Sequence, residues 1–238
     1  MNEHTHKPRS FRRLIRAGAF AFGALLAVLL AAALIVWIGA EQHTPTVVDL
    51  AHEIAHTGLT PDDLPPDWLD ALIAVEDPRF FQHPGVDLRS PGAGWTTITQ
   101  GLVKLHYPGP MRGLVGKPRQ TILARSLDRA LAKDLQLALF LNTAYFGQLD
   151  SVSLNGFPQA ARRYYGVEVV DLTLDQYLGL VAMLVGPNSF DPIRRPEAHR
   201  DRVRRIEALL AKRCVPSGWT DVYLEGCAQE ARRPAEAP

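Results

Sequence analysis

A pair of carboxylates near residue 76 is the feature of this sequence most suited to chemistry. Glu76 and Asp77 close an apolar stretch, and Phe80, His83 and Gly85 follow. Burial beside apolar side chains raises the pKa of a carboxyl group, which suits it to take a proton from an attacking hydroxyl. Such general-base assistance accelerates a reaction by about 10²–10⁴-fold. We predict this role for Glu76; the alternative is a solvated helix terminus.

Hydroxyl, amide and cationic side chains follow along the chain. The first two types hydrogen-bond sugars and phosphates, and fixed cations stabilise a diphosphate leaving group. Taken singly, each lysine is more simply a solvated surface charge. The candidates for substrate binding are Thr96, Thr97, Thr99, Gln100, Lys104, Lys117 and Lys133.

These residues together resemble the motifs of glycosyltransferase family 51, the peptidoglycan glycosyltransferases. Residues 76–85 match Glu-Asp-x-x-Phe-x-x-His-x-Gly in register. Residues 94–101 are similar to Gly-x-Ser-Thr-x-Thr-Gln-Gln, although Thr96 replaces the serine and Gly101 the second glutamine. Residues 132–142 resemble the segment Lys-x-x-Ile-Leu-x-x-Tyr-Leu-Asn. The motifs occur in the family's order and cover about residues 65–212.

The resemblance implies an all-α, lysozyme-like domain that polymerises lipid II. Such enzymes transfer a glycan strand from undecaprenyl diphosphate to the 4-hydroxyl of an incoming lipid-linked disaccharide, with inversion. His83 is expected to be a structural hydrogen-bonding residue rather than a base. By this resemblance Glu76 is the base, Gln120 takes the position of the second glutamate, and the substrate-binding residues are Asp77, Phe80, His83, Thr96, Thr97, Thr99, Gln100, Lys104, Lys117, Lys133, Asn142 and Arg202.

The chain departs from the family pattern where an Arg-Lys-x-x-Glu motif is expected. Gly116 and Gln120 replace the arginine and the glutamate, and Gln176 replaces a further glutamate. An amide keeps hydrogen bonds but loses charge, and it binds divalent cations poorly. Two readings stay open: an enzyme with weakened activity, or an impaired lipid II-binding or scaffold module. The motif set disfavours a third, a lysozyme-like hydrolase. The sequence indicates no definite cofactor, and a divalent metal (Mg²⁺ or Mn²⁺) is left open.

Helical periodicity dominates the sequence after about residue 60. Apolar stripes predict helices starting near Pro66, near Arg119 and near Leu174, and a last helix over residues 197–212. No alternating run of useful length predicts a strand. The Gly-, Pro- and Thr-rich residues 85–116 predict a long irregular region.

An uncharged apolar run precedes this domain. Residues 17–40 are long enough for a helix across a bilayer of about 30 Å. The basic tail of residues 1–16 predicts a cytoplasmic N-terminus and a periplasmic catalytic domain. A cleaved signal peptide is the competing interpretation. The expected division is completed by a stalk (41–60), the glycosyltransferase domain (61–213) and a C-terminal tail (214–238), in which Cys214 and Cys227 are either a disulfide or two thiols.

Charge and length indicate the partners. The formal net charge is +1, from 26 Lys+Arg and 25 Asp+Glu, which gives no reason to expect nucleic acid. The expected partners are lipid II, the nascent glycan strand and the membrane through the N-terminal helix. Residues after 212 are too few for a transpeptidase domain, so separate cross-linking enzymes are expected as partners. The predicted location is the bacterial inner membrane, crossed once.

Overall fold

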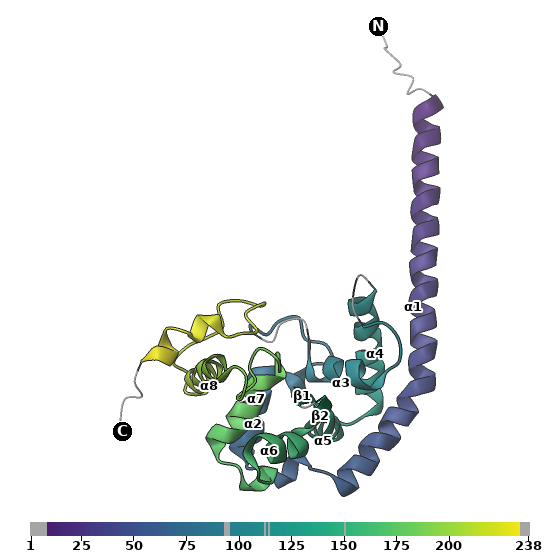
Figure 1. The fold of residues 1–238 in the computed structure, drawn as a ribbon. Helices are drawn as coiled ribbons and strands as arrows, with labels where there is room; N and C mark the ends of the chain where they lie inside the picture. The colour runs from purple at the N-terminus through teal and green to yellow at the C-terminus, as the bar shows by residue number, and fades with distance from the viewer. Residues whose placement is uncertain (1–8, 93–95, 112, 114, 150, 234–238) are drawn as a thin grey trace.

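Helices account for most of the chain (Figure 1). A computed structural model describes residues 9–92, 96–111, 113, 115–149 and 151–233. Gly94 and Trp95 of the second motif lie outside the described residues, as do residues 1–8 of the basic tail. The α-helices are α1 (Arg9–Thr57), α2 (Pro66–Glu76), α3 (Ile98–His106), α4 (Gly116–Ala130), α5 (Lys133–Thr143), α6 (Phe157–Tyr165), α7 (Leu174–Leu184) and α8 (Pro196–Leu210). The described residues also contain two strands, β1 (Tyr145–Leu149) and β2 (Val152–Asn155). Five short 3-10 helices complete the described part: η1 (Pro61–Asp63), η2 (Phe80–Gln82), η3 (Val169–Asp171), η4 (Glu225–Cys227) and η5 (Glu230–Arg232).

The first helix continues from the apolar run into the domain. Its N-terminal part is exposed and is long and apolar enough to cross a membrane. Residues 41–57, expected as a polar stalk, extend the same helix, because Ala40, Val47 and Ala51 are buried against α4 and α5. Pro45 lies inside this part, where a proline removes one helical hydrogen bond and favours a bend. Figure 1 shows α1 curving around the domain at its lower end.

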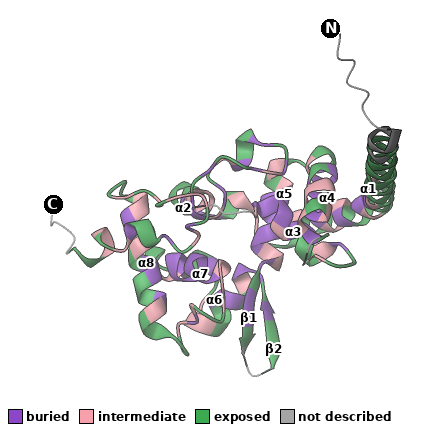
Figure 2. Cartoon of the chain, turned by 90° about the horizontal axis from the view of Figure 1, so that it is seen from above, coloured by how far each residue is buried: buried purple, intermediate pink, exposed green. Residues whose placement is uncertain are grey.

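The helices of the domain form two packed groups (Figure 2). One group contains α3, α4 and α5, which pack on one another and on the lower part of α1. The other contains α2, α6, α7 and α8. Contacts of α5 with α6, and of β1 with α7, join the two groups. Helices α2, α3 and α4 each bury one apolar face, whereas α5 and α7 are buried over consecutive residues, as expected for helices at the centre of the core.

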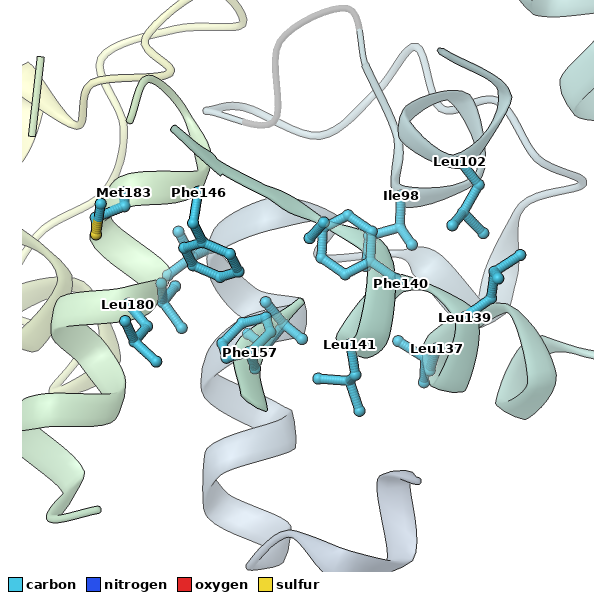
Figure 3. Close-up of a cluster of buried hydrophobic side chains, with 14 of the residues drawn as sticks. Ile98, Leu102, Leu137, Leu139, Phe140, Leu141, Phe146, Phe157, Leu180 and Met183 are labelled. Atoms are coloured by element: carbon cyan, nitrogen blue, oxygen red, sulfur yellow. The ribbon is translucent and has the colours of Figure 1, made fainter. Parts of the chain in front are cut away.

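Aromatic side chains connect α2 to the rest of the core. The rings of Trp68 and Tyr177 stack with centroids 4.6 Å apart, and Tyr177 stacks on Phe157 at 5.5 Å. Phe157 meets Phe146 edge-on at 4.9 Å. Figure 3 shows Phe146 and Phe157 beside the aliphatic residues of α5 and α7. Trp68 and the buried Leu72 are therefore core residues, which fixes the position of α2 and of the carboxylate at its end.

A short antiparallel hairpin was not expected from the sequence. Strands β1 and β2 pair with Leu149 opposite Val152, and a bulge interrupts the register next to Gly147. Gly147 has a φ of +93°, which favours glycine. Among the described side chains of the hairpin, Phe146 and Leu154 are the large apolar ones buried in the core, which are too few for a recognisable alternation.

The segment after α8, expected as a tail, folds back on the domain. Cys214 and Cys227 form a disulfide with an S–S distance of 2.03 Å. The buried Cys227 and Leu224 belong to the hydrophobic core. Figure 1 shows this segment, in yellow, lying over α8.

Candidate active site

A cleft of about 370 Å³ is lined by both groups of helices. The lining comes from the end of α2, from α3 and the residues before it, from the end of α5, β1, the end of α7, α8 and the C-terminal segment. Of the predicted site residues, it contains Glu76, Thr96, Thr97, Lys104 and Arg202. The fold therefore brings a carboxylate, two hydroxyls and two cations from three separate parts of the sequence to one cavity.

Glu76 is the last residue of α2 and is partly buried in this cleft. Burial raises the pKa of its carboxyl group to about 7, although the charges of Arg202 and Lys104 oppose the shift and Asp77 adds to it. A carboxyl group with such a pKa exchanges its proton near neutral pH, as an acid–base catalyst must.

Arg202 lies on α8 and faces the same cleft. Only 1% of the residue is exposed, and burial lowers the pKa of its guanidinium to about 10 against the opposing charge of Glu76. It is therefore still charged at neutral pH. Its Nε and Nη1 atoms have no hydrogen-bond partner among the described residues. Buried polar groups are usually hydrogen-bonded, so these two donors are available to a ligand in the cleft.

Two lysines converge on one hydroxyl at the cleft. Lys117 Nζ donates to Thr96 Oγ1 at 2.9 Å, and Lys104 Nζ donates to the same oxygen at 3.2 Å. Burial and the charge of Lys104 together lower the pKa of Lys117 to about 8. Two adjacent ammonium groups repel one another, and an anion placed between them would relieve the repulsion.

Asp77 and His83 form a buried brace beneath Glu76. Asp77 Oδ1 lies 2.8 Å from His83 Nε2, and Asp77 Oδ2 accepts a hydrogen bond from Ile98 N at 3.0 Å. Ile98 begins α3, where a carboxylate is favoured by the helix dipole and satisfies a free N–H. The brace ties the end of α2 to the start of α3, and so holds Glu76 beside Thr96 and the lysines.

The second motif is used mainly to begin α3. Thr97 and Gln100 form a capping box: Gln100 N donates to Thr97 Oγ1 at 3.1 Å, and Thr97 N donates to Gln100 Oε1 at 3.3 Å. Thr97 Oγ1 also donates to Gly85 O at 2.8 Å. Thr99 is buried and donates to Gln136 Oε1 at 2.7 Å. Thr99 and Gln100 do not line the cleft.

Lys133, from the motif at residues 132–142, lies away from the cleft lining. Lys133 Nζ contacts Asp128 Oδ1 at 2.6 Å, donates to His83 O at 3.0 Å and lies 4.3 Å from the centre of the Phe80 ring. Phe80 itself is fully buried in the core. The structure thus surrounds Lys133 with partners from its own domain.

Asn142 makes all its hydrogen bonds within the protein. Its Oδ1 accepts from Leu59 N at 3.0 Å, and its Nδ2 donates to Leu59 O and to Ala138 O, both at 2.7 Å. These bonds fasten the chain after α1 to α5, so Asn142 joins the N-terminal helix to the domain.

Comparison with known families explains this arrangement. A family model described as Transglycosylase matches residues 44–211, which is more than half of the chain. The chain belongs to the transglycosylase family. The expected all-α, lysozyme-like fold with one long apolar N-terminal helix is confirmed.

Curated relatives of this transglycosylase are penicillin-binding proteins. Penicillin-binding protein 1B of Escherichia coli is 33% identical over 164 residues, which cover 63% of this chain and 19% of that protein. Penicillin-binding protein 1F of Bacillus subtilis is 32% identical over 162 residues, covering 63% of this chain and 22% of that protein. The chain therefore spans about a fifth of the length of these relatives.

The two departures from the family's Arg-Lys-x-x-Glu motif, Gly116 and Gln120, form one structural feature. Gln120 is buried in α4, and its Nε2 donates to the carbonyl oxygen of Met111 at 2.5 Å. An added Cβ on Gly116 would lie 2.6 Å from the carbonyl carbon of Met111. The backbone at Met111 thus occupies the space that larger side chains at the start of α4 would need. Gln120 Oε1 has no partner among the described residues.

A divalent metal does not fit this arrangement. The described residues contain no group of three His, Cys, Asp or Glu side chains that could hold a metal ion. At Gln120 a neutral amide replaces the carboxylate, and its Nε2 is a donor that faces a carbonyl. Mg²⁺ and Mn²⁺ favour carboxylate and carbonyl oxygens in an open coordination site.

Sequence reasoning missed part of the cleft. Tyr145, from the strand β1, lines it, as do Val185 and Pro187 after α7. Nothing in the sequence pattern around Tyr145 indicates that this residue faces the cleft. Val222, from the C-terminal segment, also lines the cleft. No local pattern signals this, because its position depends on how the segment folds back.

Proposed function

We propose that this protein is a peptidoglycan glycosyltransferase that polymerises lipid II. The observation that carries the proposal is the shared cleft of Glu76 and Arg202, with a carboxyl pKa near 7 opposite a buried cation that has unused donors. General-base catalysis and stabilisation of a departing anion are the two demands of glycosyl transfer from a diphosphate. The family match supports the same reaction class.

In the proposed reaction, the 4-hydroxyl oxygen of the acceptor sugar attacks the anomeric carbon of the donor strand. Glu76 takes the hydroxyl proton as the new C–O bond forms. The old bond from the anomeric carbon to the diphosphate oxygen breaks, and its electron pair leaves on the lipid diphosphate. Arg202, Lys104 and Lys117 stabilise the negative charge on the leaving group, and Thr96 and Thr97 orient substrate oxygens.

The exposed part of α1 is proposed to cross the bacterial inner membrane once, with the N-terminus in the cytoplasm. This orientation follows from the basic tail before the apolar run. The domain then lies in the periplasm, where the Cys214–Cys227 disulfide is chemically stable. Both substrates carry lipid tails, so an anchored enzyme meets them in the same membrane. Separate transpeptidases are the proposed partners for cross-linking.

A second candidate is a module that binds lipid II without turnover. The hydrogen bond between Gln120 and Met111 favours it, because the position of the family's second glutamate is turned to an internal contact. This candidate keeps the cationic cleft and predicts substrate binding that is independent of proton transfer by Glu76.

Polymerisation of purified lipid II in detergent distinguishes the two candidates. We expect wild-type protein to form glycan strands, and we expect Glu76→Gln to lower the rate by about 10²–10⁴-fold, because an amide cannot accept the proton. Glu53→Gln is the matched control, since Glu53 is an exposed residue of α1 outside the cleft.

Each outcome has a definite meaning. Polymer from wild type and from Glu53→Gln, but not from Glu76→Gln, supports the enzyme and its base. Lipid II binding without polymer in all three proteins supports the binding module. If wild type neither binds nor polymerises lipid II, both candidates fail.

A further inference from the structure

The chain after the family match returns to the cleft. The match ends at residue 211, and the segment that follows is closed by the disulfide between Cys214 and Cys227. We name residues 214–227 the C-terminal loop. Within this loop, Val222 lines the same cleft as Glu76 and Arg202.

One buried carboxylate holds the shape of the C-terminal loop. Asp221 Oδ2 accepts hydrogen bonds from Ser217 N at 2.8 Å and from Gly226 N at 2.9 Å, and Asp221 Oδ1 accepts one from Glu225 N at 2.6 Å. Burial alone would raise the pKa of Asp221, but these donors hold it below its ordinary value. The loop is thus cross-linked at its ends by the disulfide and in its middle by Asp221.

The loop also contacts the chain that leads into α3. Gly92 N donates to Gly218 O at 3.0 Å, and an added Cβ on Gly92 would lie 2.6 Å from Pro216 Cγ. Gly92 itself lines the cleft. The C-terminal loop therefore contacts Gly92, a residue of the cleft lining, through both Gly218 and Pro216.

A second set of contacts joins the loop to α8 near the buried cation. Arg205 Nη1 donates to Tyr223 O at 3.0 Å and to Glu225 Oε1 at 2.6 Å. The charges of Asp221 and Glu225 also favour the protonated form of Arg202. The C-terminal loop thus borders the cleft both at Gly92 and at α8.

We propose that the C-terminal loop is a wall of the sugar-binding cleft and that Val222 contacts the bound saccharide. This inference rests on the proposed function and adds a substrate-contacting residue outside the family domain. Val222 is one of several apolar residues of the lining, with Leu184, Val185 and Pro187 among the others. A pyranose ring presents C–H groups on its faces, and an apolar wall beside a few directed polar groups is the usual form of a small-molecule site. The polar side of the cleft, with Glu76 and Arg202, then faces the hydroxyl and diphosphate oxygens.

The test compares two valines of the same loop in the full-length protein. Val222→Trp fills the cleft, and Val222→Ala removes the apolar contact. Val215→Trp is the matched control, because Val215 is 76% exposed and does not line the cleft. We expect Val222→Trp to raise the KM for lipid II by about tenfold, because the larger side chain clashes with the substrate. We expect Val222→Ala to raise it by about threefold, because one apolar contact is lost. The melting temperature and kcat should change little, and Val215→Trp should match wild type.

Reduction gives a second readout without changing Val222. The chain has only two cysteines, so dithiothreitol acts at a single disulfide. We expect reduction to raise the KM of wild type and to leave the double variant Cys214→Ser/Cys227→Ser unchanged, because that variant already lacks the cross-link.

The outcomes separate this inference from the proposed function. If wild type polymerises lipid II but Val222→Trp has the KM of Val215→Trp, the wall is not part of the site and the inference is overturned. If wild type binds lipid II without turnover, the same comparison is made with the dissociation constant, and a weaker affinity of Val222→Trp alone sustains the inference. A loss of kcat at constant KM together with a lowered melting temperature would mean that the substitution acts on folding, and would also overturn the inference.

Discussion

The end of α2 and the start of α4 use their polar side chains in opposite ways. At the end of α2, Glu76 faces a cleft, and the nearby Arg202 has two nitrogens without a hydrogen-bond partner among the described residues. At the start of α4, Gln120 turns to the carbonyl of Met111, and Gly116 lets that backbone approach closely. Polar groups held ready for a ligand are costly to a fold, whereas groups paired internally stabilise it. The comparison teaches that the first region keeps polar groups available to a ligand, while in the second region a neutral amide makes an internal hydrogen bond at the position of the family's glutamate.

The largest effect that would break this comparison is expected at Arg202. Arg202→Met removes the cation, and we expect kcat/KM for lipid II to fall by about 100-fold, because charge-assisted hydrogen bonds to a diphosphate are lost. Arg202 lowers the pKa of Glu76, so the acid limb of the pH–rate profile, expected near pH 7, should also move to higher pH. Arg202→Lys keeps the charge and should retain the position of that limb. An unchanged limb in Arg202→Met would separate Arg202 from Glu76.

The second effect concerns Gln120. Gln120→Glu places a carboxylate against the Met111 carbonyl oxygen, which accepts a hydrogen bond from the amide at 2.5 Å. We expect the free energy of unfolding at pH 7 to fall by about 2–3 kcal/mol, because a buried charge meets an acceptor instead of a donor. Polymerisation should not increase. Gln120→Met, which has similar volume and no charge, is the control. A faster Gln120→Glu enzyme would show that the family carboxylate still has a role here.

A third effect tests whether the ionised Glu76 lowers the free energy of unfolding. Its folded pKa is about 7, above the ordinary value of 4.5, so the folded state binds the proton more tightly. The stability contributed by the protonated form is complete below pH 4.5 and is lost as pH rises to 7. We therefore expect Glu76→Gln to raise the free energy of unfolding by about 1–2 kcal/mol at pH 8, a value reduced for the solvent contact of this residue. The difference should vanish at pH 4, and denaturant unfolding at both pH values measures it.

The smallest effect is expected at another departure from the family pattern. Gln176 caps α7: its backbone N donates to Thr173 Oγ1 at 3.3 Å, and its Oε1 accepts from Thr173 N at 2.9 Å. Glutamate serves this capping box equally well. We expect Gln176→Glu to change the free energy of unfolding by less than about 0.5 kcal/mol and to leave polymerisation unaltered. A large loss of either would mean that the neutral amide at this position has another role.

The helices and the carboxylate at the end of α2 could be predicted because their signals are local. The stripe of α7 and the motif around Glu76 depend on neighbours a few residues apart. The last helix was predicted over residues 197–212, within two residues of the observed Pro196–Leu210 at each end. The start of α4 was placed at Arg119 instead of Gly116, because a glycine, a lysine and a proline are a weak helix start on propensity alone.

The roles of the polar motif residues were harder to predict. Thr99, Gln100, Lys133 and Asn142 have the types that bind sugars and phosphates, yet each makes its described hydrogen bonds within the protein. Residue type and order cannot distinguish a side chain that faces a ligand from one that fastens two helices. The same limit applies to Val222, whose contact with the cleft is made by long-range folding of the C-terminal loop.

The unbroken helix α1 has a mechanical consequence. Between Ala40 and Thr57 it is pressed against α4 and α5, and no loop separates this part from the exposed apolar part. If the apolar part crosses the membrane as we propose, a continuous helix rather than a flexible linker connects the domain to the membrane. The height of the cleft above the lipid headgroups and the direction it faces are then set by one helix, at about 1.5 Å and 100° for every residue. A single residue inserted in α1 before Ala40 would rotate the whole domain relative to the proposed membrane surface.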